Sequence, residues 1–171
     1  MGSAARLSLR EYQLALSERL QGAQAGVRVA SRLGFRASGD CWVIDLAEAG
    51  EVMPVPSITP VPGVQPWFKG VANVRGNLYS VTDFSAFAGD QAGGLSEHAR
   101  LIIVAARLRV GAALLVERSL GLRTAESLKP HAAQAMQPWV KAQYIDADGT
   151  VWKELDVAAL VQNESFLEVT L

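Results

Sequence analysis

The residues from 51 to 89, EVMPVPSITPVPGVQPWFKGVANVRGNLYSVTDFSAFAG, decide how this chain folds. Short apolar runs that are typical of strands alternate here with glycines, and five prolines fall between Pro54 and Pro66. Because proline cannot donate a hydrogen bond to a β ladder, the proline-rich part is expected at a sheet edge or in an extended loop. Two strands, over residues 70–74 and 78–81, are expected to follow it.

A tight turn through Arg75, Gly76 and Asn77 is expected to join these two strands. Gly76 is expected to take a backbone conformation that other residues avoid, which presents Arg75 at the turn. Arginine and tryptophan are frequent anchors of protein interfaces, so Arg75 and Trp67 are candidates for partner contact. The alternative stays open: Trp67 caps the fold and Arg75 makes a surface ion pair.

The rest of the chain has the same texture of short strands divided by turn residues. Turns are expected at Ser38-Gly39-Asp40, near Leu108-Arg109, and at Asp148-Gly149, which is a type I′ signal. This pattern indicates an all-β barrel or a pair of barrels, and the absence of alternating strands and helices argues against a nucleotide-binding α/β fold. A short helix is expected over residues 157–162. The other strands are expected over residues 33–37, 41–46, 52–55, 100–107, 110–117, 119–123, 139–145 and 150–155.

The first thirty residues read differently from the remainder. Ser8 and Glu11 form a capping box, and apolar residues follow at helical spacing, so residues 1–30 are expected to be a helical extension ahead of a domain over residues 31–171. This helix either packs its apolar stripe on its own domain or docks on a partner, and the sequence leaves both open.

Composition excludes several classes of partner. Sixteen basic and seventeen acidic residues give a net charge of −1, which is not the electrostatic footprint of a nucleic-acid binder and gives no attraction to anionic lipid. The longest apolar runs, residues 101–106 and 112–116, are strand-sized, whereas a membrane-spanning helix needs about 18 apolar residues. Charged residues near the start and no apolar run behind them argue against a secretory signal, so a cytoplasmic protein without direct membrane insertion is expected.

Catalytic and metal-binding motifs are missing from the sequence. Cys41 is the only cysteine, which excludes an intrachain disulfide and a cysteine-rich metal site, and His98 and His131 sit in polar loop context. The run from Asp146 to Gly149 is similar to the start of a calcium loop, but the sixth and twelfth loop positions hold valines. We therefore expect no enzyme activity, no cofactor and no metal. A partner-binding module is the leading interpretation, and a small-molecule-binding β-barrel is the second.

The central stretch contains a set of short motifs at characteristic spacing: Glu51-Val52, Ile58-Thr59-Pro60, the run from Gly70 to Gly76, then Val81 and Asp83. With these motifs the chain resembles the CheW family of chemotaxis coupling proteins. The resemblance covers residues 33–160 and is similar in detail to the branch of the family that serves type IV pilus (twitching) systems. Two positions depart from the family pattern, Tyr79-Ser80 and Asp83-Phe84, and they put partner preference in doubt, not the fold.

The resemblance implies two small packed five-stranded β-barrels, SH3-like, with the N-terminal helix and a short C-terminal helix. It implies a non-enzymatic adaptor that couples the cytoplasmic tip of a methyl-accepting chemoreceptor to the regulatory domain of a CheA-like histidine kinase, in arrays at the membrane. A flagellar chemotaxis coupler and an unrelated ligand-binding module are the alternatives. Glycines at the motif positions are expected to let a partner approach the backbone. The partner-binding residues that the resemblance implies are Arg75, Gly76, Gly70, Glu51 and Val52, with Trp67 and Asn77 as neighbours.

Overall fold

The computed structural model describes residues 31–89, 95–132 and 136–171. The expected N-terminal helical extension over residues 1–30 lies outside the described residues. Within the described parts of the chain, no helix is long and apolar enough to cross a membrane.

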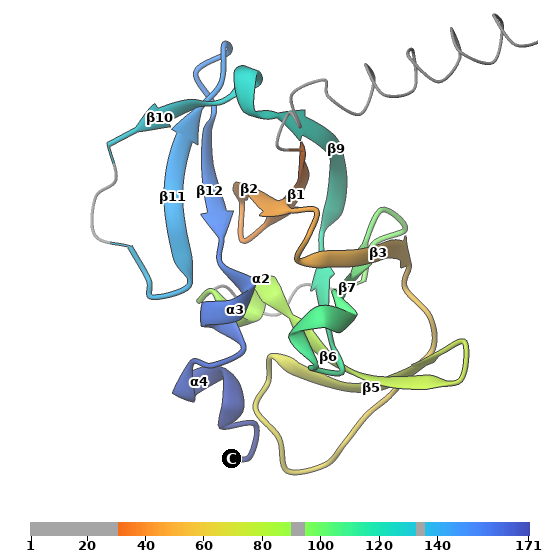
Figure 1. Cartoon of the computed structure of the whole chain (residues 1–171). Helices are drawn as coiled ribbons and strands as arrows, with labels where there is room; N and C mark the ends of the chain where they lie inside the picture. The colour runs from red at the N-terminus through yellow and green to blue at the C-terminus, as the bar shows by residue number, and fades with distance from the viewer. Residues whose placement is uncertain (1–30, 90–94, 133–135) are drawn as a thin grey trace, which may run out of the picture.

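Two β-sheets make up the described structure (Figure 1). The chain builds β1 and β2 of the first sheet, then the whole second sheet, and then returns to complete the first sheet with β9 to β12. The first sheet has the order β10 (Lys129–His131), β11 (Val140–Ile145), β12 (Val151–Leu155), β2 (Asp40–Asp45), β1 (Ser31–Ala37), β9 (Arg118–Thr124). The second has the order β3 (Ala49–Pro54), β7 (Arg100–Val104), β8 (Ala112–Val116), β6 (Asn77–Asp83), β5 (Phe68–Val74), β4 (Ile58–Thr59).

Short helices fill the joints between the sheets. Figure 1 shows α2 and α3 between the two sheets and α4 beside the C-terminus. Asp83, Asp156 and Asn163 cap the three helices by accepting a hydrogen bond from a backbone N–H of the first turn, which is the usual way to begin a helix. The helical elements are α2 (Phe84–Phe87), α3 (Val157–Leu160), α4 (Glu164–Leu167) and the 3₁₀ turns η1 (Ala106–Leu108) and η2 (Ala125–Ser127).

The all-β prediction is confirmed, and so is the short C-terminal helix, to which the structure adds α4. Each sheet, however, has six strands where five were expected. Among the described residues neither sheet pairs its first strand with its last, so the two sheets are not the closed barrels that were expected. The additional strands are short edges, β4 with two residues and β10 with three. In β4 the ladder ends at Thr59 because Pro60 has no N–H to donate, so the prediction of an edge position for the proline-rich part is confirmed.

Three clusters of buried side chains hold the sheets. The largest lies between the two sheets, where Phe35 and Trp42 of the first sheet pack edge-on against Phe84 of α2. It also takes Ile102 and Leu114 from the second sheet, so this cluster joins the two halves of the fold. A second cluster lies on the other face of the second sheet and contains Ala72, Val74, Val81, Ala99, Leu101, Ile103, Ala113 and Leu115. A third, on the other face of the first sheet, contains Val43, Leu128 and Trp152.

The hairpin from β11 to β12 is confirmed, but its predicted turn type is wrong. A type I′ turn needs positive φ at both central residues, and of Asp148 and Gly149 only Gly149 has it, with φ of 81°. The reason is Asp146, whose carboxylate accepts hydrogen bonds from the backbone N–H of Asp148 and Thr150 and from Trp152 Nε1. These bonds hold a longer loop and lower the pKa of Asp146, the bond from Trp152 contributing most.

Candidate partner-binding surface

The turn between β5 and β6 confirms the expected presentation of Arg75. Val74 pairs with Asn77, so Arg75 and Gly76 form a two-residue loop, with φ of 51° and 88°. These values are those of a type I′ turn, whose positions favour Asn and Gly because other residues are strained at positive φ. Gly76 has open space around it, and its N–H donates to Asn73 Oδ1 at 2.8 Å. An arginine therefore occupies a strained position at an exposed tip.

Arg75 and Glu51 form a bidentate ion pair. Arg75 Nη1 donates to Glu51 Oε2 at 2.8 Å and Nη2 donates to Oε1 at 2.7 Å. Glu51 lies on β3, at one edge of the second sheet, whereas Arg75 follows β5, which lies next to the opposite edge strand. The pair therefore joins one edge of the sheet to a turn near the opposite edge, two regions that backbone hydrogen bonds do not connect directly.

The ion pair is open to solvent, because the Arg75 side chain is 75% exposed and that of Glu51 is 38% exposed. Ion pairs at this exposure contribute about 0–1 kcal/mol to folding stability. The positive φ of Arg75 costs stability, and an ion pair this exposed returns little of it. A residue that keeps a strained backbone conformation in this way points to a functional role.

Four more residues extend this surface around the ion pair. Val52 follows Glu51 on β3 and packs partly on the core between the sheets, while Asn77 is exposed at the start of β6. Leu78, which sequence reasoning missed, follows Asn77 on β6 and is 67% exposed. Tyr79 and Val81 point into the second cluster, so strand alternation turns Leu78 to the opposite face of β6, where it is exposed near the start of the strand. We call Glu51, Val52, Arg75, Gly76, Asn77 and Leu78 the hairpin-tip surface.

The sequence suggested that Gly70 lets a partner approach the backbone, but in the structure the chain's own residues lie against this glycine. It is buried, has φ of 126°, and a side chain at this position would collide with the carbonyl oxygen of Thr59. The chain's own β4 occupies the space that a partner would need. Gly70 therefore belongs to the packing of β4 on β5, and the threonine–proline segment and this glycine act as one structural unit.

Trp67 lies at the opposite end of β5 from Arg75, so the structure does not bring these two candidates together. Its half-buried ring stacks on Phe166 at 5.9 Å between centroids and meets Phe87 edge-on at 5.2 Å. The interpretation of Trp67 as a cap of the fold agrees with these contacts.

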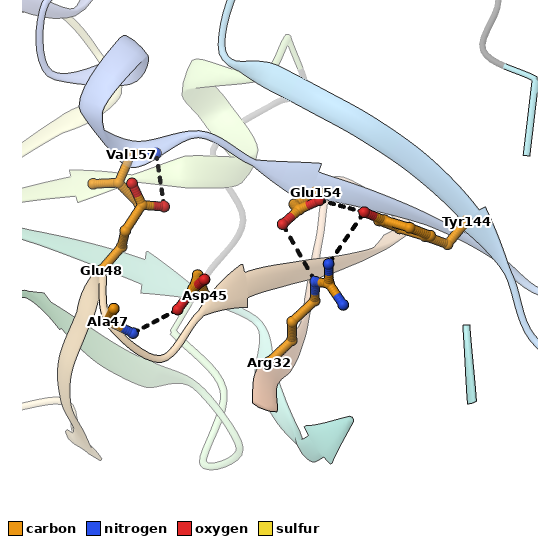
Figure 2. A network of polar contacts seen from close by, with 7 residues as sticks. All are labelled: Arg32, Asp45, Ala47, Glu48, Tyr144, Glu154 and Val157. Carbon is orange, nitrogen blue, oxygen red and sulfur yellow. Dashed lines mark hydrogen bonds and ion pairs between the residues drawn. The ribbon is translucent and has the colours of Figure 1, made fainter. Parts of the chain in front are cut away.

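A buried polar network braces the first sheet (Figure 2). Arg32 Nε lies 3.2 Å from Glu154 Oε1, and Tyr144 donates its hydroxyl hydrogen to Glu154 Oε2 at 2.6 Å. The side chains of Arg32 and Glu154 are only 15% and 5% exposed. Burial, followed by the bond to Glu154, raises the pKa of Tyr144. These residues come from β1, β12 and β11, with Glu154 buried and Arg32 and Tyr144 half-buried, so they are placed to hold the strands together.

Among the described residues, no group of three or more His, Cys, Asp or Glu side chains could hold a metal ion. Cys41 packs partly against the third cluster, and His98 and His131 are exposed. The arrangement offers surfaces for contact and groups for hydrogen bonding.

Comparison with known proteins assigns the chain to a family. The sequence pattern of the CheW-like domain matches residues 32–165. The chain is 34% identical over 162 residues to Protein PilI from Pseudomonas aeruginosa, an alignment that covers 91% of this chain and 89% of that protein. Its fold is similar to the scaffolding protein TtCheW from Thermoanaerobacter tengcongensis, with a TM-score of 0.63 and 22% identity over 74% of this chain and 88% of that one. The chain belongs to the CheW-like domain family, whose members are non-enzymatic scaffolds and adaptors of chemotaxis-type signalling.

Proposed function

We propose that this chain couples the cytoplasmic tip of a methyl-accepting chemoreceptor to the regulatory domain of a CheA-like histidine kinase, and that it does so in the system that controls type IV pilus twitching. The similarity to PilI over nine-tenths of the chain supports the pilus assignment. In this proposal the protein works in the cytoplasm and is recruited to receptor arrays at the membrane by its partners.

The observation that carries the proposal is the Arg75–Glu51 pair at the hairpin tip. Both residues lie at positions that the family resemblance links to partner binding, and the structure brings them into contact across the sheet. The pair holds the guanidinium plane in one orientation, which lowers the entropy lost when a partner binds to it.

Arg75 keeps donors for a partner while it holds Glu51. A guanidinium has five N–H donors, and the pair with Glu51 uses two nitrogens of the fork for one bond each. The remaining donors can bind a carboxylate or a backbone carbonyl, such as the side chains and helix ends that a helical hairpin tip presents. Leu78 supplies an exposed apolar contact beside it. In the proposal, the hairpin-tip surface is the receptor-facing side of the adaptor.

The test is reconstitution of a ternary complex from this protein, a receptor cytoplasmic fragment and the kinase regulatory domain. Arg75→Glu is expected to weaken receptor binding by about 30-fold, which corresponds to the hot-spot scale of about 2 kcal/mol, and to leave the kinase bound. Arg118→Glu is the matched control, because it reverses an exposed arginine on β9 of the other sheet. Unchanged receptor affinity in a folded Arg75→Glu protein would contradict the assignment of this surface.

A charge swap separates a contact role from a bracing role. If Arg75 only braces the sheet, the double variant Arg75→Glu with Glu51→Arg restores the pair and restores binding. If Arg75 itself contacts the receptor, the double variant stays weak. The second result is expected, and titration calorimetry with the receptor fragment measures it.

A further inference from the structure

The C-terminal residues cross from one sheet to the other. The segment begins at α3, whose Val157 and Leu160 are buried in the cluster between the sheets, directly after β12 of the first sheet. It then runs through α4, where Phe166 packs on Trp67, and ends beside the loop that precedes β5 (Figure 1). We call residues 161–171 the strap and residues 60–66 the proline loop.

Hydrogen bonds join the end of the strap to the proline loop. The backbone N–H of Gln65 donates to the carbonyl of Val169 at 2.8 Å, and that of Leu171 donates to the carbonyl of Gly63 at 3.2 Å. The side-chain amide of Gln65 donates to the carbonyl of Thr170 at 3.0 Å. These contacts are exposed to water, which competes for them, and Leu171 is 84% exposed.

The proline loop has little means of holding itself in place. Pro60, Pro62 and Pro66 cannot donate hydrogen bonds, and residues 60–63 are exposed. Its contact with the strap supplies three hydrogen bonds that help to fix its position. Both partners in this contact are at the low end of local stability, where few apolar groups are buried and the hydrogen bonds face solvent.

The strap is one wall of an open groove of about 270 Å³. The opposite wall includes Trp67, which follows the proline loop, Phe68 of β5, and Val110, which precedes β8. From the strap, Phe166, Leu167 and Val169 line the groove. Release of residues 168–171 would widen the groove at Val169 and leave Phe166 packed in the cluster between the sheets.

We infer that residues 168–171 are a latch: they hold the proline loop through their backbone hydrogen bonds, and they release while both sheets and Phe166 stay in place. This conformational device goes beyond the proposed adaptor role and does not depend on which partners the protein binds. It gives the proline loop a held state and a released state.

Removal of residues 168–171 tests the latch. In the truncated protein, the amide of Gln65, which loses its acceptor at Val169, is expected to exchange with deuterium about 100-fold faster, while amides of β7 and β8 and the urea midpoint stay as in the full chain. The indole N–H signal of Trp67, assigned by its loss in Trp67→Phe, is expected to shift, and those of the other three tryptophans are expected to stay. If truncation lowers the urea midpoint and speeds exchange in β7 and β8, the strap is part of the core and the inference is wrong.

A disulfide between positions 64 and 170 provides the opposite control. Val64 and Thr170 form an antiparallel bridge, whose Cα separation suits a disulfide, and Cys41→Ala removes the competing thiol. In the oxidised Val64→Cys, Thr170→Cys protein, the Gln65 amide is expected to exchange more slowly than in the reduced form. Equal exchange in the oxidised and reduced proteins would show that the latch does not open, and would also overturn the inference.

Discussion

Each of the two sheets carries an arginine–glutamate pair, but the two pairs lie in opposite environments. In the first sheet Arg32 and Glu154 are 15% and 5% exposed and share Tyr144 as a third member. In the second sheet Arg75 and Glu51 are 75% and 38% exposed and have the shorter contacts. Arg32 and Glu154 lie on strands that are not neighbours in their sheet, and Arg75, in the turn between β5 and β6, reaches Glu51 on β3, which is not a neighbour of either strand.

The difference shows that good geometry is no measure of what an ion pair does for the fold. A buried pair has lost its water, so removal of one partner leaves an uncompensated charge in the interior. An exposed pair keeps most of its hydration, and its loss costs little. The first pair is thus placed to specify how β1, β11 and β12 pack. The second is free to serve contacts outside the chain.

The largest expected effect comes from breaking the buried pair. Glu154→Ala is expected to lower the free energy of unfolding by about 3–5 kcal/mol, because it leaves the Arg32 guanidinium beside Tyr144 without its carboxylate partner. Urea denaturation followed by tryptophan fluorescence measures the change. The control is a triple variant that removes both charges and the tyrosine hydroxyl together. This variant, Arg32→Met with Glu154→Leu and Tyr144→Phe, is expected to be much more stable than the single variant. A single variant no less stable than this control would contradict the reasoning.

A smaller effect is expected at Glu48, which lies near this network and accepts a hydrogen bond from the backbone N–H of Val157 at 3.5 Å (Figure 2). Burial raises the pKa of Glu48 above its usual 4.5, so the folded state holds the proton more tightly than the unfolded state. Ionisation therefore costs stability as the pH rises from 4.5 through the raised pKa, and the cost is complete above it.

Glu48→Gln keeps the carbonyl oxygen that accepts from Val157 and removes the charge. It is expected to raise the urea midpoint at pH 7, and the gain is expected to disappear below pH 4.5, where Glu48 is protonated in both states. Paired urea titrations across this pH range measure the difference. A gain that is the same at every pH would show that burial of the charge is not its cause.

Local rules were sufficient for much of the fold. Period-2 alternation and the turn residues predicted most strands and the exposed tip at Arg75, because both depend on residues close in sequence. The pairing of β5 with β6 through Gly76 is of this kind. The family resemblance, which rests on the same stretch, added Glu51 as a candidate, and the structure then placed it against Arg75.

The rest could not be predicted because it depends on contacts between distant segments. Gly70 was recognised as special, but the atom that requires glycine there belongs to Thr59, and its approach depends on how β4 pairs with β5. The same holds for Trp67, whose neighbour Phe166 lies about a hundred residues further along the chain. The buried bond between Arg32 and Glu154 likewise joins residues 122 positions apart.

The variant with the smallest expected effect on stability, Arg75→Asn, gives the most direct test of the contrast between the two ion pairs. Arg75→Asn loses the exposed pair with Glu51, which is worth about 0–1 kcal/mol, but places a favoured residue at a type I′ position with φ of 51°. The two changes oppose each other, so the free energy of unfolding is expected to stay within about 1 kcal/mol of its original value. Urea denaturation measures this, and receptor binding is measured on the same preparation. If Arg75→Asn is as stable as the original protein and has lost receptor affinity, the arginine is kept at a strained position for its partner. If it has lost stability on the scale of Glu154→Ala, the pair braces the second sheet as the buried pair braces the first, and the contrast between the two pairs is wrong.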